Sequence, residues 1–178
     1  MSAQPAWLPP LALLADYDGD WNRYLEAIYE HYRRDFVTSR PNFEDKRVAP
    51  ANRTLASGKE STFWHLISEG KVEEKRLPDI RRCERIRWPR PIIDSSSTNR
   101  VRAWRNLHKK QRRVAIALDD FSYVVVLIER KKYALLVTAY LVSEEHQRSK
   151  LRKEYEAQNK AGAAAKWNDA RTPSTHGG

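Results

Sequence analysis

Cysteine, methionine and glycine are scarce in this chain of 178 residues, and each shortage excludes a class of protein. The single cysteine, Cys83, cannot form an internal disulfide, and one thiolate is too few for a cysteine-based zinc site. Only six glycines are present, and three of them follow residue 160, which leaves no glycine-rich phosphate loop. The longest aliphatic run, Val124–Ile128, is far too short for a membrane span of roughly 18 apolar residues. We therefore expect a cytoplasmic protein with no membrane contact, no cofactor and no metal.

Acidic residues are in the minority, and the surplus of positive charge is confined to one part of the chain. The formal net charge is +10, and all of this excess falls in residues 71–113, which hold fifteen lysines and arginines against five acids. Eleven of the fifteen are arginines, whose planar guanidinium binds phosphate in two places and stacks on bases. We call residues 71–113 the basic segment and expect it to bind a polyanion, RNA above all. The alternative is a solvated basic surface without a ligand.

Aromatic residues are interleaved with these cations, as expected where unpaired bases stack on a protein. The candidate nucleic-acid-binding residues are Arg81, Arg85, Arg87, Trp88, Arg90, Arg102, Trp104, Arg105, Lys109, Lys110, Arg112 and Arg113. The whole chain has six tryptophans, eight tyrosines and four phenylalanines, which is too many for a disordered protein. A folded core is therefore expected as well as a binding surface.

The first half of the chain predicts helices. Apolar residues recur at helical spacing over residues 21–37, and Asp20 is the expected N-cap. A second, short helix is predicted over residues 61–70, and a third from Pro78 to about Arg87. Residues 38–59 lack periodicity and predict a connecting loop with at most one short strand.

The second half predicts a sheet. Residues 113–119, 122–129 and 133–142 read as strands joined by short turns, so neighbouring strands are antiparallel. The middle strand is almost wholly apolar, which predicts a central position covered on both faces. A charged helix is expected over residues 143–160, and apolar residues stand at helical spacing within residues 99–111.

These elements predict an α+β fold, with N-terminal helices followed by a three- to four-stranded antiparallel meander and a C-terminal helix. We expect a flexible N-terminal lead at residues 1–15, a single domain over residues 16–160 and a disordered tail at residues 161–178.

Three polar residues near the second predicted helix have the chemistry for RNA cleavage without a metal. His65 lies at the polar edge of this helix, and Lys59 and Glu60 stand just before it. Because histidine titrates near neutral pH, these three side chains can share the proton transfers, although His65 can equally be an ordinary surface histidine. The arginines that can hold the phosphate and its developing charge are Arg81, Arg82, Arg85, Arg87 and Arg130.

The last predicted strand contributes two further candidates, Thr138 and Tyr140. Side chains alternate across a strand, so these two share a face with Leu136. Residues 137, 139 and 141 form the other face, which is wholly apolar and is the better core face. Thr138 and Tyr140 are therefore expected on the more polar side, where they can touch a substrate or simply pack.

Two short motifs and their order in the chain carry a resemblance to a known superfamily. The motifs are Phe63–Leu66 (FWHL) and Tyr133–Tyr140 (YALLVTAY), separated by the arginine-rich stretch. Over residues 55–150 the chain resembles the phage-associated branch of the Barnase–EndoU–colicin–RelE-like ribonuclease superfamily. It departs from that pattern by a long basic insertion before its first predicted strand.

The resemblance implies metal-independent RNA cleavage, as in toxins of prophages and of toxin–antitoxin systems, which a protein partner usually holds in check. It implies that His65 takes the helical histidine position and Thr138 the polar position of the last strand, with cations from residues 81–90.

The resulting hypothesis is a toxin-like, metal-independent endoribonuclease that attacks through the RNA 2′-OH by general acid–base catalysis. Its catalytic candidates are His65, Lys59, Glu60, Arg82, Thr138 and Tyr140. One alternative is a non-catalytic RNA- or DNA-binding protein that uses the same basic segment. Another is an interaction module that docks an acidic partner there, such as an antitoxin, an immunity protein or a capsid component.

Overall fold

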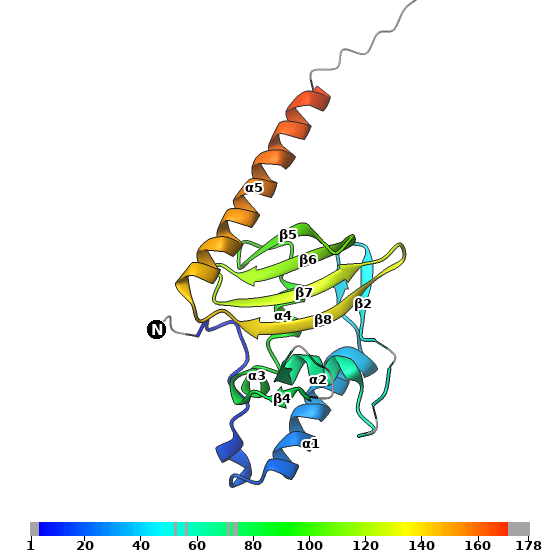
Figure 1. The fold of residues 1–178 in the computed structure, drawn as a ribbon, viewed down its shortest axis with the longest axis vertical. Helices are drawn as coiled ribbons and strands as arrows, with labels where there is room; N and C mark the ends of the chain where they lie inside the picture. The colour runs from blue at the N-terminus through cyan, green and yellow to red at the C-terminus, as the bar shows by residue number, and fades with distance from the viewer. Residues whose placement is uncertain (1–3, 52, 56, 71, 73–74, 171–178) are drawn as a thin grey trace, which may run out of the picture.

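The computed structural model describes residues 4–51, 53–55, 57–70, 72 and 75–170, with side chains up to residue 162 (Figure 1). The fold is mixed α+β: most strands follow the helices in sequence, and another helix follows the last strand. The early elements are η1 Leu14–Tyr17, α1 Trp21–Tyr32, η2 Arg33–Thr38, β1 Asn42–Phe43, β2 Lys46–Ala49, α2 Ser61–Ile67, β3 Ser68–Glu69 and β4 Leu77–Pro78. The later ones are α3 Ile80–Glu84, α4 Pro89–Asp94, β5 Val101–His108, β6 Gln111–Leu118, β7 Tyr123–Glu129, β8 Tyr133–Leu141 and α5 Glu145–Ala170.

A four-stranded antiparallel meander, β5 to β8, is the centre of the fold. The three strands predicted from apolar runs are confirmed as β6, β7 and β8. Strand β7 has a partner on each side and is buried from Tyr123 to Ile128, which confirms its predicted central position. The β5–β6 hairpin turns at Lys109 and Lys110, whose φ angles of 47° and 64° match the tight I′ turn that suits the twist of paired strands.

Strand β5 corrects one expectation. The helical spacing within residues 99–111 is misleading, because this stretch pairs along its whole length with β6. A spacing of three places residues on opposite faces of a strand. Val101 accordingly packs in the core on one side of the sheet and Trp104 in the cluster on the other.

The sheet is also wider than the predicted three or four strands. Residues 38–59 supply two short strands rather than at most one, and the complete order is β1-β2-β8-β7-β6-β5. Strand β2 runs parallel to β8 and pairs only from Arg47 to Ala49, opposite Tyr133 to Leu135. Beyond Leu135, none of the described strands pairs with the outer side of β8, and we call this stretch the open edge of β8.

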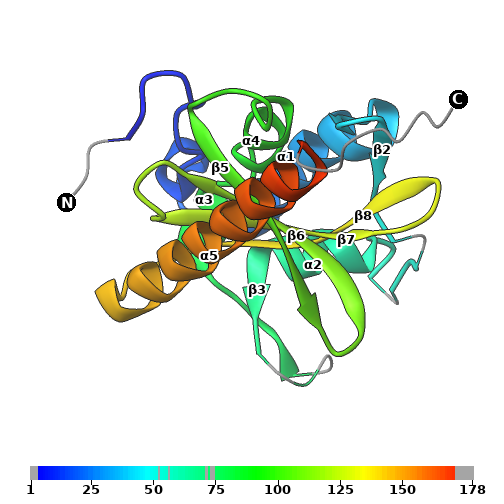
Figure 2. The same cartoon turned by 90° about the horizontal axis from the view of Figure 1, so that it is seen from above.

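Helices cover the two faces of the sheet (Figures 1 and 2). Helices α1 to α4 lie on one side with the larger apolar cluster, while α5 crosses the other side over Trp104 and Phe121. Residues 4–15, expected in a flexible lead, lie against the first side, where Leu8 and Ala12 are buried. Helix α5 continues to Ala170, so the predicted disordered tail is helical up to there, and residues 171–178 lie outside the described residues.

The alternation predicted for the last strand is interrupted. Register shifts between Val126 and Leu127, because their partners on β8 are Thr138 and Leu136, so Val137 is an extra residue. Leu136 consequently packs with the helices α1 to α4, whereas Tyr140 packs on the α5 side. The expectation that these two share a face is therefore wrong.

The two-sided burial of β7 yields a test of the fold. Leu127 is fully buried between the layers, whereas Leu107 near the β5–β6 turn is 72% exposed. We expect Leu127→Ala to lower the free energy of unfolding by about 2–5 kcal/mol, through lost burial and a residual cavity. Leu107→Ala is the matched control and should change it by less than about 0.5 kcal/mol. Urea denaturation measures both, and equal losses would contradict the arrangement.

Candidate active site and basic surface

Three of the six catalytic candidates, Arg82, Thr138 and Tyr140, meet at the open edge of β8, and the main chain of a fourth, His65, lies beside them. Helix α2 lies beside this edge, and the Thr138 hydroxyl donates a hydrogen bond to the main-chain oxygen of His65 over 3.1 Å. Helix α3 follows closely, because its N-cap residue Asp79 donates its backbone N–H to the oxygen of Ile67, the last residue of α2. The two helices thus bring His65 and the first turn of α3 to the same stretch of β8.

Arg82 of α3 connects the members of this cluster. One terminal guanidinium nitrogen lies 3.4 Å from the Thr138 hydroxyl and 3.4 Å from the main-chain oxygen of Ala139. The guanidinium carbon also lies 5.7 Å from the centre of the Tyr140 ring, within the range of a cation–π contact. We call His65, Arg82, Thr138 and Tyr140 the edge cluster.

Tyr140 is half-buried, and burial and the neighbouring arginines shift the pKa of its phenol in opposite directions. Burial raises the pKa of its phenol above the usual value, while the nearby charges of Arg82 and Arg113 lower it less. The phenol therefore stays protonated at neutral pH. The raised pKa also makes this phenol a weaker acid than an exposed tyrosine.

Lys59 and Glu60 are held by α1 instead. The Lys59 ammonium contacts Glu26 at 2.6 Å and lies 4.6 Å from the centre of the Tyr29 ring. The Tyr29 hydroxyl donates to the Glu60 carboxylate over 2.8 Å, and burial together with this bond raises the pKa of Tyr29 to about 12. These contacts join α1 to the start of α2. The structure therefore gives Lys59 and Glu60 a role in holding helices together rather than a contact with Arg82 or Thr138.

Both tryptophans of the basic segment are core residues. Trp88 is 4% exposed and donates its indole N–H to the oxygen of Pro9 over 3.0 Å. Trp104 is 3% exposed and packs against Phe121 and Tyr155. The expectation that these rings stack on bases does not fit their burial.

Several arginines of the basic segment are also occupied inside the protein. Arg85 lies against Trp88 and binds the oxygen of Arg81, while Arg90 binds Asp94 and the oxygen of Asp35. Arg102 pairs with Asp119 over 2.5 Å. The Nε atoms of Arg87 and Arg113 are buried. The amino-acid sequence alone does not separate these cations from exposed ones.

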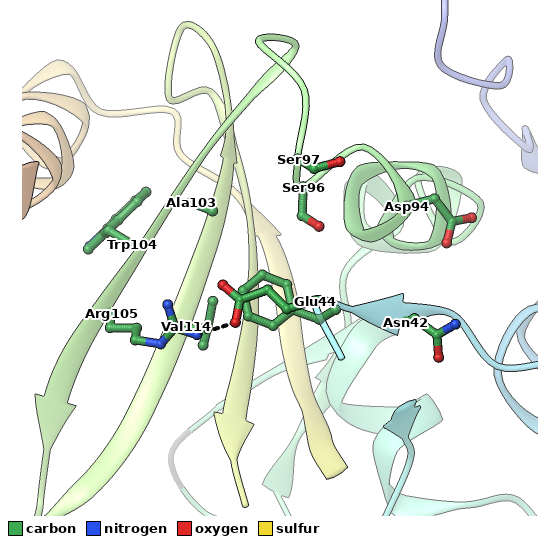
Figure 3. Close-up of a pocket in the computed structure, with 10 residues that line it drawn as sticks. Asn42, Glu44, Asp94, Ser96, Ser97, Ala103, Trp104, Arg105 and Val114 are labelled. Carbon is green, nitrogen blue, oxygen red and sulfur yellow. Dashed lines mark hydrogen bonds and ion pairs between the residues drawn. The ribbon is translucent and has the colours of Figure 1, made fainter. Parts of the chain in front are cut away.

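Arg105 takes part in the densest ion-pair network. Its guanidinium contacts Glu129 at 3.1 Å and Glu44 at 2.6 Å, and these bonds raise its pKa. Lys46 and Arg112 also bind Glu129, whose side chain is 6% exposed. A cavity of about 420 Å³ lies beside Arg105, and the ion pair between Arg105 and Glu44 lies across it (Figure 3). The cation that faces this cavity is therefore already neutralised.

Exposed cations gather instead at one end of the sheet. The tips of the β5–β6 and β7–β8 hairpins lie at this end, since Arg113 pairs with Ile128 next to both (Figure 1). Among the residues that the structure describes, five cations at the two tips are exposed and have no hydrogen-bond or ion-pair partner for their side chains: Lys109, Lys110, Arg130, Lys131 and Lys132. Arg81 of α3 is exposed as well, away from these tips.

Two arginines outside the basic segment join this end. Arg40 and Arg47 line an open pocket of about 570 Å³ with Tyr133 and Leu135. Both precede the basic segment, and Arg47 lies on a strand that the sequence pattern does not reveal. Arg130, one of the arginines expected to hold phosphate, lies in the turn that precedes Tyr133.

The described ranges contain no group of three or more histidine, cysteine, aspartate or glutamate side chains arranged to hold a metal ion. Within the same ranges, every helix is too short or too polar to cross a membrane. Comparisons with protein families, curated proteins and solved structures find no match for this chain.

The Glu129 network predicts a defined pH dependence of stability. Hydrogen bonds from Arg105, then from Lys46, lower the pKa of Glu129 to about 2 from an ordinary value near 4.5. A lowered carboxyl pKa stabilises the fold above about pH 4.5, and this contribution disappears as the pH falls toward 2. The wild type should therefore lose stability across this window, by up to about 3 kcal/mol from this group.

Glu129→Gln removes the titrating group and provides the comparison. We expect the variant to be less stable than the wild type at pH 6, because Arg105 and Lys46 lose their charge partner. The difference between the two proteins should shrink as the pH falls from 5 to 3. Urea denaturation at each pH measures it, and a constant difference would disprove the role of Glu129.

Proposed function

We propose that the protein is a metal-independent endoribonuclease whose active site is the edge cluster. One observation carries the proposal: Arg82, Thr138 and Tyr140, from segments far apart in sequence, meet at the open edge of β8 beside the main chain of His65. The residues of the cluster carry an imidazole, a phenol and a guanidinium. These are the parts that RNA cleavage without a metal requires.

The proposed reaction is an internal transfer within the RNA. The ribose 2′-OH loses its proton to a base and attacks the adjacent phosphorus, while the bond to the 5′-oxygen breaks and that oxygen gains a proton from an acid. The products are a 2′,3′-cyclic phosphate and a free 5′-OH, with no net uptake or release of protons. Hydrolysis of the cyclic phosphate is not required for strand cleavage.

Each member of the edge cluster has a role in this scheme. The His65 imidazole is the base in its neutral form, and the protonated Tyr140 phenol is the acid. Arg82 holds the phosphate and stabilises its added negative charge, which is where a preorganised cation contributes most. Thr138 fixes α2 against β8 through its bond to the His65 oxygen and so positions the base.

A second candidate function is RNA binding without cleavage. It is favoured by the contacts of Thr138 and Arg82 with main-chain oxygens at the open edge of β8, because these bonds also serve simply to join α2 and α3 to the sheet. Under this alternative, the exposed cations at the hairpin tips bind RNA and the edge cluster is structural.

An RNA cleavage assay in excess EDTA separates the two functions. The full-length chain is incubated with a labelled single-stranded RNA, and His65→Ala, Tyr140→Phe and Arg82→Ala are compared with it. His65→Ala leaves the main-chain oxygen that Thr138 binds, and Tyr140→Phe leaves the ring below Arg82. We expect rate losses of about 10²- to 10⁴-fold for His65 and Tyr140 and about 10²- to 10³-fold for Arg82, with a cyclic phosphate as product.

His31→Ala is the matched control, because His31 lies on α1 and bonds to Arg34 rather than to the edge cluster. It should cleave at the wild-type rate, and thermal unfolding should show that every variant is folded. If the wild type shifts the RNA in a gel but leaves it intact, the ribonuclease proposal is wrong and RNA binding without cleavage takes its place. Wild-type cleavage by His65→Ala would refute the assignment of the site.

A further inference from the structure

The open pocket beside the β7–β8 hairpin combines exposed cations with an exposed aromatic ring. Tyr133, the first residue of β8, is 43% exposed and lies directly opposite Arg47 of β2. Arg40 completes the cationic side of the pocket, and Leu135 and Ala51 contribute to its wall. We call this the Tyr133 pocket.

The cations of the Tyr133 pocket are available to a ligand. In the part of the chain that the structure describes, the side chains of Arg40 and Arg47 are exposed and form no hydrogen bond or ion pair. This distinguishes them from Arg105, which is neutralised by Glu44 and Glu129. An arginine whose charge is not compensated by the protein is the better donor to an external phosphate.

The adjoining turn adds further positive charge. Arg130 donates its backbone N–H to the oxygen of Tyr133 over 2.9 Å, so the turn is closed and places Lys131 and Lys132 next to the ring. Among the described acids near this turn, Glu44 and Glu129 are paired with Arg105, and Asp45 is exposed. The electrostatic potential around the pocket is therefore positive.

We propose that the Tyr133 pocket binds a single-stranded nucleic acid, with a base stacked on Tyr133 and the flanking phosphates on Arg40 and Arg47. This ligand is RNA if the proposed function holds, and to that extent the inference depends on it. A half-exposed ring among free cations suits an unpaired base, whose face is open to stacking. A duplex keeps its base faces covered, and an acidic protein has no base to stack.

The position of the pocket connects it to the edge cluster. Tyr133 and Thr138 lie on the same strand, and five residues of strand span about 17 Å at roughly 3.3 Å per residue. The pocket and the cluster also share α2, because Ala51 donates its N–H to the hydroxyl of Thr62 on that helix over 2.8 Å. We infer that an RNA strand held in the pocket extends along β8 toward the edge cluster.

Binding is tested in a His65→Ala background, where RNA stays intact under the proposed function. Fluorescence anisotropy measures the Kd of a labelled 12-nucleotide single strand over a range of salt concentrations. Tyr133→Ala should weaken binding by roughly 5- to 100-fold, and Tyr133→Phe, which keeps the ring, should bind within about twofold of the parent. The Arg40→Ala/Arg47→Ala double variant should also reduce the slope of log K against log salt by about 1.4.

Arg23→Ala is the control for lost charge, since Arg23 is an exposed arginine on α1. It should bind like the parent. A Tyr133→Ala variant that binds like the parent would overturn the inference. The inference would also be overturned if Tyr133→Ala lost as much affinity for a double-stranded RNA or for polyglutamate as for the single strand. Such a result would show a general effect of charge rather than a base-stacking site.

Cleavage assays with His65 intact distinguish failure of this inference from failure of the proposed function. A dinucleotide is too short to reach from the edge cluster to the pocket, so Tyr133→Ala should cleave it normally and should raise KM only for the longer strand. An unchanged KM for the longer strand would overturn the inference and leave the ribonuclease intact. Binding that depends on Tyr133 without any cleavage would refute the proposed ribonuclease function and support the binding role of the Tyr133 pocket.

Discussion

The end of parallel pairing at Leu135 is the constraint on which the candidate active site depends. Strand β2 pairs with the outer side of β8 for only three residues, and no other strand in the described part of the chain pairs with that side of β8. A free edge exposes backbone groups that need covering. Here Arg82 of α3 covers the main-chain oxygen of Ala139, and the Thr138 hydroxyl joins β8 to α2 through the main-chain oxygen of His65. The edge cluster exists because a sheet edge was closed by side chains rather than by another strand.

Internal ion pairing determines which positive charges face outward. The basic segment has a large excess of cations, yet Arg90, Arg102 and Arg105 are bound to acids or to main-chain oxygens within the protein. The unpaired cations at the two hairpin tips come partly from outside this segment, as do Arg40 and Arg47. The uncompensated positive charge therefore lies at one end of the sheet, where the β7–β8 turn closes beside Tyr133, rather than along the whole basic segment.

The bulge on β8 shows why face assignments by alternation failed. One extra residue at Val137 changes the parity of the strand, so that Leu136 and Tyr140 belong to different layers. A bulge depends on pairing with a neighbouring strand and leaves no trace in local periodicity. The burial of Trp88 and Trp104 has a similar origin, since each ring packs against residues from remote parts of the chain.

The sequence alone determined the elements that depend on local patterns. These are the N-cap of α1 at Asp20 and the apolar strands β6, β7 and β8 with their short turns. The catalytic roles of His65, Arg82, Thr138 and Tyr140 stay a prediction. The tertiary structure alone decided that Arg82, Thr138 and Tyr140 meet beside the main chain of His65, that β1 and β2 complete the sheet, and which cations remain unpaired. The physical reason is that strand pairing and ion pairs join residues distant in sequence, whereas periodicity and capping report only on neighbours.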